Sequence, residues 1–402
     1  EKLRLPVKTI VRDDSPDGNF GKKVTEQTYD KYGNVLSLDV YDTEPGKYKR
    51  EYNYSSFGIC VGEKYMKDKN TKVEIVRTLT ALGKSIGSET VFENGVEIKH
   101  DDYEYTPMCD IKRSRVQTGK DTFAVTEYEY SGSYPCPNAV TNKDVENADG
   151  VCENITTRYE YDKFGNVVKI DYGNGIKKSY SYDLLGRRIE ETLEDGLKRT
   201  AVYNDTENSI TTTDARGTSL VYKYSQAGLL QSVTDYLTGN VFTMRTYDEM
   251  SRLVTEKLST GALVKSEYDG RDRLVSYETY DDSGKLYEST KLSYNGAPKQ
   301  CLGGTEITVL KFDGKKERKT VYLYDILGSL ISTSVYADGE VYVTENKTDY
   351  LGNIVSEIDA NGNETKYERD IFGNPTRVIN PLGAADTYDY DFMGNAVKHI
   401  NA

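Results

Sequence analysis

A pattern that recurs at a fixed spacing constrains this chain more than any other feature of its sequence. The five residues from Tyr161 to Gly165 read YDKFG, those from Tyr182 to Gly186 read YDLLG, and the two glycines are 21 residues apart. A period of this size is typical of repeat proteins, in which each short unit buries its apolar face against its neighbours. The sequence therefore predicts a row of similar units.

The unit reads as a β-hairpin. From Lys178 to Asp183 tyrosines alternate with small or polar residues, which indicates a strand with one apolar face. Asp183 and Gly186 suit the first and fourth positions of a type I turn, where the glycine adopts positive φ and forms a bulge. Residues 187–194 then predict the returning strand, and Asp195-Gly196 predicts a second turn.

The pattern recurs along most of the chain, and we expect its members to be structural. The tyrosine is predicted to bury its ring and keep its hydroxyl hydrogen-bonded, and the aspartate to stabilise the turn. The residues that carry the pattern are Tyr29, Asp30, Gly33, Tyr161, Asp162, Gly165, Tyr182, Asp183, Gly186, Tyr224, Gly228, Tyr247, Asp248, Tyr268, Asp269, Tyr324, Asp325, Gly328, Gly352, Gly373 and Gly394.

These copies predict that residues 1–402 form one continuous array. We expect a weakly patterned lead-in over 1–28, degenerate repeats over 29–130, an inserted loop over 131–153, where apolar residues are few, and regular repeats over 154–402. The chain does not begin with Met and stops within a repeat. We therefore expect a fragment of a longer protein.

Composition supports an all-β fold. The chain has 35 Tyr, 34 Gly and no Trp among 402 residues, a usage that favours pleated strands joined by tight turns. An antiparallel sheet built from this many hairpins cannot stay flat, because strand twist accumulates. The predicted fold is a long, curved antiparallel sheet that forms a spiral or a partial, barrel-like shell.

The Tyr-Asp-x-x-Gly unit, with an apolar residue two positions later as in Gly165/Val167, Gly328/Leu330 and Gly352/Ile354, resembles the YD repeat of Rhs proteins. This family includes bacterial polymorphic toxins, the B and C components of insecticidal toxin complexes, and the teneurins. The resemblance covers most of 158–402 clearly and 29–130 more loosely. It implies a hairpin array that encloses a C-terminal toxic polypeptide, or an extracellular scaffold.

The chain departs from a complete toxin of this family in two respects. These 402 residues contain neither the Pro-x-x-x-x-Asp-Pro-x-Gly core motif that carries the autoproteolytic aspartates nor a toxin domain. The resemblance therefore does not imply self-cleavage or toxicity for these residues.

Charge and hydropathy exclude several partners. With 65 acidic and 52 basic residues the net charge is −13, whereas nucleic acids and anionic membranes need a basic face. No apolar run is long enough for a transmembrane helix. We expect no nucleic acid partner and no membrane insertion by this segment. The resemblance to Rhs proteins implies a secreted or cell-surface location.

The five cysteines leave two interpretations open. Cys136 and Cys152 bracket the predicted loop and could form a disulfide in an oxidising compartment, or all the cysteines could be free thiols. No Cys or His spacing suggests a zinc site.

Catalysis is not expected. A catalytic group occurs once, whereas the Tyr-Asp pair recurs, and only His100 and His399 are available for a triad or a His-based metal site. The run from Asp359 to Asn363 is similar to a calcium loop but lacks the glycine that such a loop needs at its sixth position, where Glu364 stands. We therefore predict no cofactor.

Two functions stay open. The first is a non-enzymatic structural segment that encloses or displays a C-terminal polypeptide of its parent protein. The second is an adhesin that binds a surface receptor or glycan through its tyrosine-rich surface, because tyrosine rings can stack on sugars. We expect most tyrosines to form cross-strand ladders within the sheet instead.

Overall fold

The computed structural model describes residues 5–12, 22–41, 45–131, 135–146, 151–296 and 304–402. In this part of the chain every regular element is a β-strand, and each strand whose register is determined pairs antiparallel with its neighbours in the sequence. The prediction of an all-β fold of tandem antiparallel hairpins is therefore confirmed. Cys301 and the turn-rich residues 13–19 lie outside the described residues.

The chain divides into two compact units. Unit 1 comprises Glu1–Val125, Ser293–Val309 and Arg318–Ala402, and unit 2 comprises Thr126–Leu292 and Leu310–Glu317. Unit 2 is thus inserted between the first and last parts of unit 1. Each unit is described by itself below.

Unit 1 contains the first and the last strands of the chain. They are β1 (Lys8–Arg12), β2 (Lys22–Tyr29), β3 (Val35–Tyr41), β4 (Arg50–Tyr54), β5 (Cys60–Met66), β6 (Lys72–Leu79), β7 (Ile86–Glu93), β8 (Val96–Tyr105), β9 (Ile111–Gln117), β27 (Leu330–Ala337), β28 (Glu340–Thr348), β29 (Ile354–Ile358), β30 (Glu364–Arg369), β31 (Pro375–Ile379), β32 (Ala385–Tyr390) and β33 (Ala396–Ile400).

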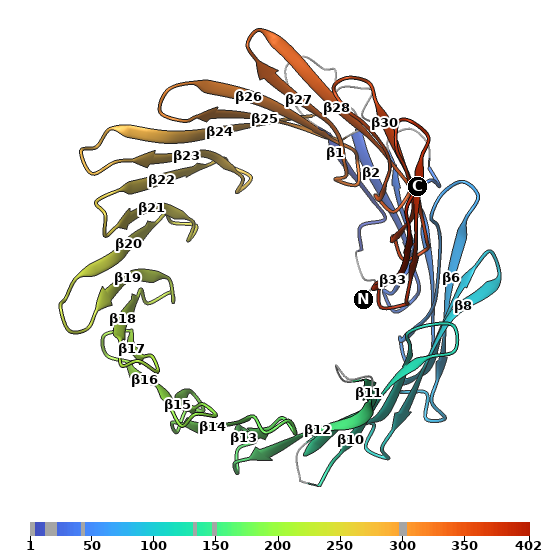
Figure 1. Cartoon of the computed structure of the whole chain (residues 1–402), viewed down its shortest axis with the longest axis horizontal. Helices are drawn as coiled ribbons and strands as arrows, with labels where there is room; N and C mark the ends of the chain where they lie inside the picture. Colours follow the sequence, from blue (N-terminus) through green and yellow to red (C-terminus); the bar gives the residue numbers. More distant parts are fainter. Residues whose placement is uncertain (1–4, 13–21, 42–44, 132–134, 147–150, 297–303) are drawn as a thin grey trace. The chain divides into compact units, whose positions relative to one another are not determined.

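Unit 2 contains the middle strands, which follow one another in chain order along a curved row (Figure 1). They are β11 (Ala139–Glu146), β12 (Cys152–Tyr161), β13 (Val167–Asp171), β14 (Lys177–Tyr182), β15 (Arg188–Thr192), β16 (Lys198–Asn204), β17 (Ser209–Thr213), β18 (Ser219–Tyr224), β19 (Leu230–Asp235), β20 (Val241–Tyr247), β21 (Leu253–Leu258), β22 (Leu263–Tyr268) and β23 (Leu274–Tyr280). Four strands cross the boundary between the units, namely β10 (Phe123–Glu129), β24 (Leu286–Gly296), β25 (Thr305–Phe312) and β26 (Glu317–Tyr324).

Every Tyr-Asp copy shifts the strand register in the same way. In the β14–β15 pair Ser181 lies opposite Glu190, but the next residue, Tyr182, lies opposite Arg188. One residue of the returning strand is therefore left unpaired beside the turn, which is a β-bulge. The same shift occurs at Tyr161, Tyr224, Tyr247 and Tyr268.

The segment 131–153 is not the inserted loop that the sequence predicts, because it contains β11. Ala139 and Thr141 alternate with more exposed neighbours, and both are buried. This strand buries small side chains in place of Val, Ile or Tyr, so the count of large apolar residues did not reveal it. The predicted lead-in likewise contains β1, which pairs with β2.

The disulfide interpretation is wrong for this structure, in which Cys136 and Cys152 are free thiols. Ala139 pairs with Arg158 at one end of the β11–β12 hairpin, whereas Glu146 pairs with Cys152 at the other end. Cys136 precedes Ala139, so the two cysteines lie at opposite ends of a hairpin roughly 20 Å long. A disulfide needs Cα atoms within about 7 Å.

Few apolar side chains are fully buried in the described residues. Val24 and Val73 are each 1% exposed, and one cluster of buried side chains joins Val73, Val91 and Ile371. A sheet that is mostly one layer thick leaves its side chains half-buried. Its stability must therefore depend strongly on contacts between neighbouring hairpins along the row.

Candidate functional site

The repeated Tyr-Asp turn is the feature with the most regular chemistry in the structure. In the copy at Asp162, carboxylate Oδ1 accepts hydrogen bonds from the backbone N–H of Phe164 at 2.8 Å and of Asn166 at 2.9 Å, and Oδ2 accepts one from the Asn166 side chain at 2.9 Å. Gly165, with φ of 87°, donates its N–H to the Asp162 carbonyl at 3.1 Å. One carboxylate thus organises the whole turn.

The hydrogen bond from the Asn166 side chain lowers the pKa of Asp162 below its ordinary value. The same arrangement, with an Asn four residues after the Asp, lowers the pKa of Asp30, Asp359 and Asp391. In the loop that is similar to a calcium site, the Asp359 carboxylate accepts from the N–H groups of Asn361 and Asn363. Asp359 therefore stabilises its turn in the same way as the other turn aspartates.

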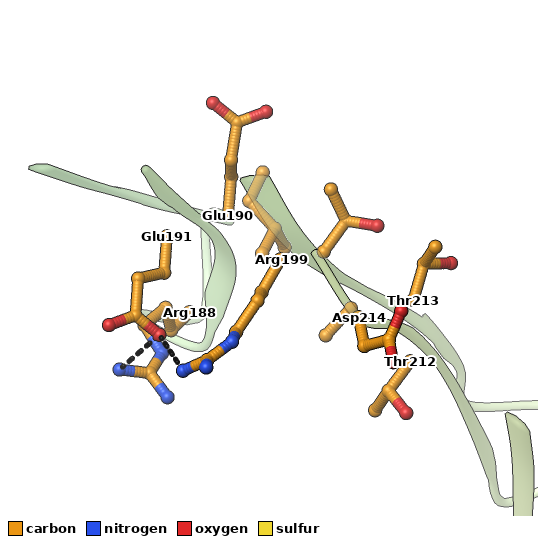
Figure 2. A pocket seen from close by; sticks show the side chains of 10 residues that line it. Arg188, Glu190, Glu191, Arg199, Thr212, Thr213 and Asp214 are labelled. Atoms are coloured by element: carbon orange, nitrogen blue, oxygen red, sulfur yellow. Dashed lines mark ion pairs between the residues drawn. The ribbon is translucent and has the colours of Figure 1, made fainter. Parts of the chain in front are cut away.

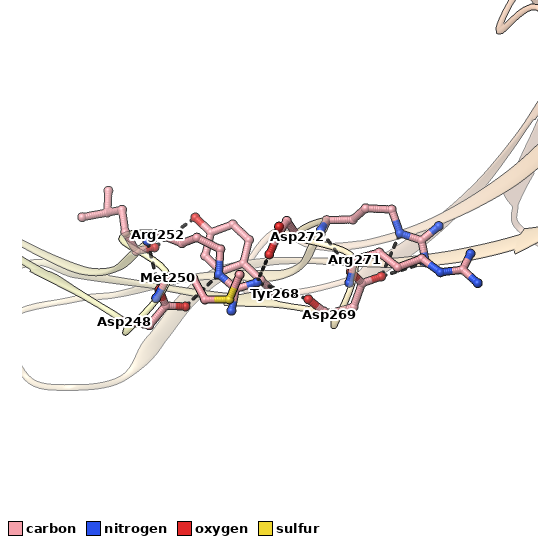
Figure 3. A network of polar contacts seen from close by, with 9 residues as sticks. Asp248, Met250, Arg252, Tyr268, Asp269, Arg271 and Asp272 are labelled. Atoms are coloured by element: carbon pink, nitrogen blue, oxygen red, sulfur yellow. Dashed lines mark hydrogen bonds and ion pairs between the residues drawn. The ribbon is translucent and has the colours of Figure 1, made fainter. Parts of the chain in front are cut away.

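In two copies an arginine that replaces that Asn connects two neighbouring turns (Figure 3). Arg252 Nε donates to Asp248 Oδ2 of its own turn at 2.8 Å, and Nη1 donates to Asp272 Oδ1 of the next turn at 2.8 Å. The guanidinium also lies over the ring of Tyr268, 4.9 Å from its centroid. Arg187 makes the equivalent contacts with Asp183, Asp205 and Tyr203.

In several copies the tyrosine hydroxyl connects its hairpin to the preceding one. Tyr182 donates to the carbonyl of Val167 at 2.9 Å, Tyr247 to that of Leu230 at 2.7 Å, and Tyr268 to that of Leu253 at 3.0 Å. Each acceptor is the first residue of the strand that follows the preceding Tyr-Asp turn. Burial raises the pKa of Tyr182 above its ordinary value.

Sequence reasoning missed two residues that replace this tyrosine. In the copies at Asp349 and Asp370 the preceding residues are Thr348 and Arg369. Arg369 Nε donates to the carbonyl of Ile354 at 2.7 Å, and Asn346, two residues before Thr348, donates its side-chain N–H to the carbonyl of Leu330 at 3.2 Å. Arg369 is a long polar donor at the tyrosine position itself, which is a signal available in the sequence, whereas Asn346 lies two residues before that position and gives no such signal.

The predicted glycine position also tolerates other residues. Ser251 and Asp272 stand in it with φ of 66° and 63°, and Cys109 stands in the equivalent turn of unit 1 with φ of 70°. A non-glycine residue in this conformation carries a backbone penalty. In the copy at Tyr224, Ser225 replaces the Asp and its hydroxyl accepts the N–H of Leu229 at 3.2 Å.

The structure places the predicted repeat residues at equivalent turns. These turns follow β2 for Tyr29, Asp30 and Gly33; β12 for Tyr161, Asp162 and Gly165; β14 for Tyr182, Asp183 and Gly186; β18 for Tyr224 and Gly228; β20 for Tyr247 and Asp248; β22 for Tyr268 and Asp269; β26 for Tyr324, Asp325 and Gly328; and β28, β30 and β32 for Gly352, Gly373 and Gly394.

Tyrosine rings do not form the expected ladder across strands. Among the described residues, the two tyrosines of each stacked or tilted pair lie on the same strand. These pairs are Tyr159 with Tyr161 and Tyr388 with Tyr390. Between strands, rings are covered by cations instead, as with Arg188 over Tyr180 and Lys265 over Tyr280. Contacts between a cation and an aromatic face thus replace the expected ring stacking.

A hollow of about 290 Å³ in unit 2 gathers charged side chains over β15, β16 and β17 (Figure 2). Glu191, whose side chain is 10% exposed, lies 3.7 Å from Arg199 and from Lys178 and 4.0 Å from Arg188. The carboxylate sits among three cations. The lining supplies ion pairs and threonine hydroxyls, which are contacts that hold strands together.

The two histidines lie in separate polar contacts. His100 Nδ1 is 2.7 Å from Thr90 Oγ1 and its Nε2 is 2.9 Å from Asp102 Oδ1, all within β7 and β8. His399 stacks on Tyr388 with ring centroids 4.5 Å apart. Across the residues that the structure describes, no group of three or more His, Cys, Asp or Glu is arranged to hold a metal ion. Nor does any helix there have the length and apolarity to cross a membrane.

Solved structures of Tc toxins resemble this chain at low identity. The structure of TcdB2-TccC3 without its hypervariable C-terminal region is 13% identical, with a TM-score of 0.47, over 99% of this chain and 23% of that chain. The Photorhabdus luminescens Tc holotoxin pore is 13% identical, with a TM-score of 0.37, over 98% of this chain and 22% of that chain. This chain thus spans less than a quarter of their length.

No curated protein matches the chain. Residues 161–200 and 349–385, however, match the RHS Repeat family. Both stretches contain the Asp-centred turn and the hydrogen bond from one hairpin to the next that are described above, in which Tyr182 and Arg369 are the donors. The chain therefore contains RHS repeats in these two stretches, as the resemblance of its Tyr-Asp turns to YD repeats implies.

Proposed function

We propose that this chain is a non-enzymatic wall segment of a secreted or cell-surface Rhs protein, and that the wall encloses a C-terminal polypeptide of the parent protein. The observation that carries the proposal is the repeated connection between hairpins: a Tyr, Arg or Asn side chain of one hairpin donates to the backbone of the preceding one. Such connections give a continuous sheet that resists local opening, which a containing wall requires.

The proposed partner is a polypeptide held against one face of the sheet. Enclosure is tested by expressing the repeats together with the polypeptide that follows them in the parent protein, and by digesting the product with protease. The same polypeptide expressed alone is the control. Protection of the polypeptide in the presence of the repeats supports enclosure, and equal digestion rates in both samples would overturn it.

A second candidate is an adhesin that binds glycans through exposed tyrosines. Tyr32, Tyr236 and Tyr287 are 65%, 61% and 64% exposed, so their rings can stack on a sugar, although the Lys31 ammonium lies over one face of the Tyr32 ring. Binding on a glycan array that disappears in the triple Ala variant of these residues would favour adhesion. Retention of all binding in that variant, or no binding by the original protein, would exclude this surface.

A further inference from the structure

In unit 1 the turns of the last repeats contact the first hairpins, although about 300 residues separate them in the sequence. We refer to residues 349–352, 370–373 and 391–394 as the docked turns. The N–H of Tyr350 donates to the carbonyl of Lys67 at 2.8 Å, and the N–H of Phe392 donates to the carbonyl of Thr118 at 2.7 Å. Between them, Ile371 packs against Val73 and Val91.

The three residues that make these contacts occupy one position of the repeat. Tyr350, Ile371 and Phe392 each follow the turn aspartate directly, and they are 21 residues apart. In a Tyr-Asp turn the aspartate and its carbonyl bind the N–H groups of the second, third and fourth residues after the Asp, as Asp391 does with Met393, Gly394 and Asn395. The N–H of the first residue is not used by the turn, so it is available for docking.

The accepting side consists of hairpin turns in the first repeats. Lys67 begins the turn between β5 and β6, and Thr118 begins the turn that follows β9. The Lys67 side chain adds a contact in the opposite direction, because its ammonium donates to the carbonyl of Arg369 at 2.6 Å. Lys67 is only 7% exposed, which is unusual for a lysine.

Burial at this position is a consequence of docking and not of the repeat itself. Ile371 is 7% exposed, whereas Leu184, in the same turn position of a unit 2 repeat, is 96% exposed. The two turns have the same carboxylate hydrogen bonds, since Asp370 and Asp183 both accept from the second and fourth following N–H groups. Leu184 is therefore a matched control for Ile371.

We propose that the docked turns hold the first and last parts of unit 1 together. Separation of the docked turns from β5–β9 then opens unit 1 without unfolding individual hairpins. The biological role of this docking rests on the proposed function, because a wall retains a polypeptide only while its first and last repeats stay together. The docking itself is independent of any enclosed polypeptide.

The test is hydrogen exchange of the full chain, measured by mass spectrometry without any partner. Ile371→Asp places a carboxylate against Val73 and Val91, and we expect exchange to rise about tenfold or more in 66–72, 91–98 and 349–394. Exchange in β13–β23 and the far-ultraviolet circular dichroism should not change. Leu184→Asp should change none of these regions.

Lys67→Met removes only the ammonium donor and provides a second, milder variant. It should raise exchange in 66–72 and 364–373 even if Ile371→Asp fails to fold. Unchanged exchange at 66–72 in both variants would overturn the proposal. So would a rise spread evenly over both units, because that result would make Ile371 an ordinary core residue. Failure of the protease experiment alone would refute enclosure and leave the docking intact.

Discussion

The side chain of Asn346 donates to the carbonyl oxygen of Leu330 at 3.2 Å, in the place where a tyrosine hydroxyl makes the equivalent bond in other repeats. Arg369 does the same with Ile354. Tyr, Asn and Arg side chains thus donate to the equivalent backbone carbonyl, at the start of a strand, in three different repeats. What the repeat maintains at this position is a hydrogen-bond donor of sufficient reach, and tyrosine is its usual form.

The first prediction concerns the tyrosine hydroxyl. Tyr182→Phe keeps the half-buried ring but leaves the carbonyl of Val167 without its donor, so the free energy of unfolding should fall by about 1 kcal/mol. Tyr287→Phe is the control, because Tyr287 is 64% exposed, and it should have no measurable effect. Denaturant titration measures both variants, and an equal loss in the two would contradict the assigned role.

The second prediction compares two turn glycines with nearly equal backbone angles. Gly328 has φ of 90° and Gly373 has φ of 93°, so alanine should cost about 1–2 kcal/mol of backbone strain at either. At Gly373 a Cβ would also lie 3.0 Å from Oδ1 of Asn353, whereas nothing lies within 4 Å at Gly328. Gly373→Ala should therefore lower the melting temperature more than Gly328→Ala, and the reverse order would refute the contact.

The third prediction is a stabilising substitution. Ser251 occupies the glycine position with φ of 66°, and Ser251→Gly should raise the free energy of unfolding by about 1 kcal/mol, because glycine adopts this conformation without strain. Ser251→Ala keeps the strain and should give no gain. If both variants were equally stable in thermal unfolding, strain at this position would not limit stability.

The fourth prediction concerns acid. Hydrogen bonds from Asn34, Asn166, Asn363 and Asn395 lower the pKa of the turn aspartates that they contact, so these carboxylates stabilise the fold above roughly pH 4, the ordinary pKa of Asp. Their contribution is lost as the pH falls through the lowered pKa values of the folded state. Melting temperatures should therefore drop steeply below roughly pH 4.

A matched variant isolates this effect. Replacing Asp30, Asp162, Asp359 and Asp391 together with Asn keeps an oxygen acceptor at each turn but removes the titration. The melting temperature of this variant should be lower at neutral pH and should fall less on acidification. A slope identical to that of the original protein would show that other groups cause the acid sensitivity.

Local chemistry explains which parts of the fold were predictable. The turn at Asp183 is specified by residues within four positions of it, so the hairpins and their antiparallel order follow from the sequence. β11 was missed because Ala139 and Thr141 are small, and small buried residues give little hydropathic signal. The interpretation of Cys136 and Cys152 as a disulfide was wrong because the hairpin register, which places Cys152 opposite Glu146, was unknown.

Long-range contacts explain what was not predictable in the candidate site. The replacement donor Asn346 acts across two hairpins, and its role appears only once Leu330 is seen beside it. Ile371 and Leu184 occupy the same position of the repeat, yet one is buried and the other is exposed. The period of a sequence specifies how neighbours pair. It does not specify which repeats meet again after about 300 residues.

The most direct test of the account is whether the connection between hairpins acts locally. Hydrogen exchange of Tyr182→Phe should increase in residues 162–171 and 179–192, on both sides of the lost bond to Val167, and should not change in 241–258. That result would show that each tyrosine holds its own hairpin against the preceding one. Unchanged exchange at 162–171, or an equal increase throughout unit 2, would contradict it.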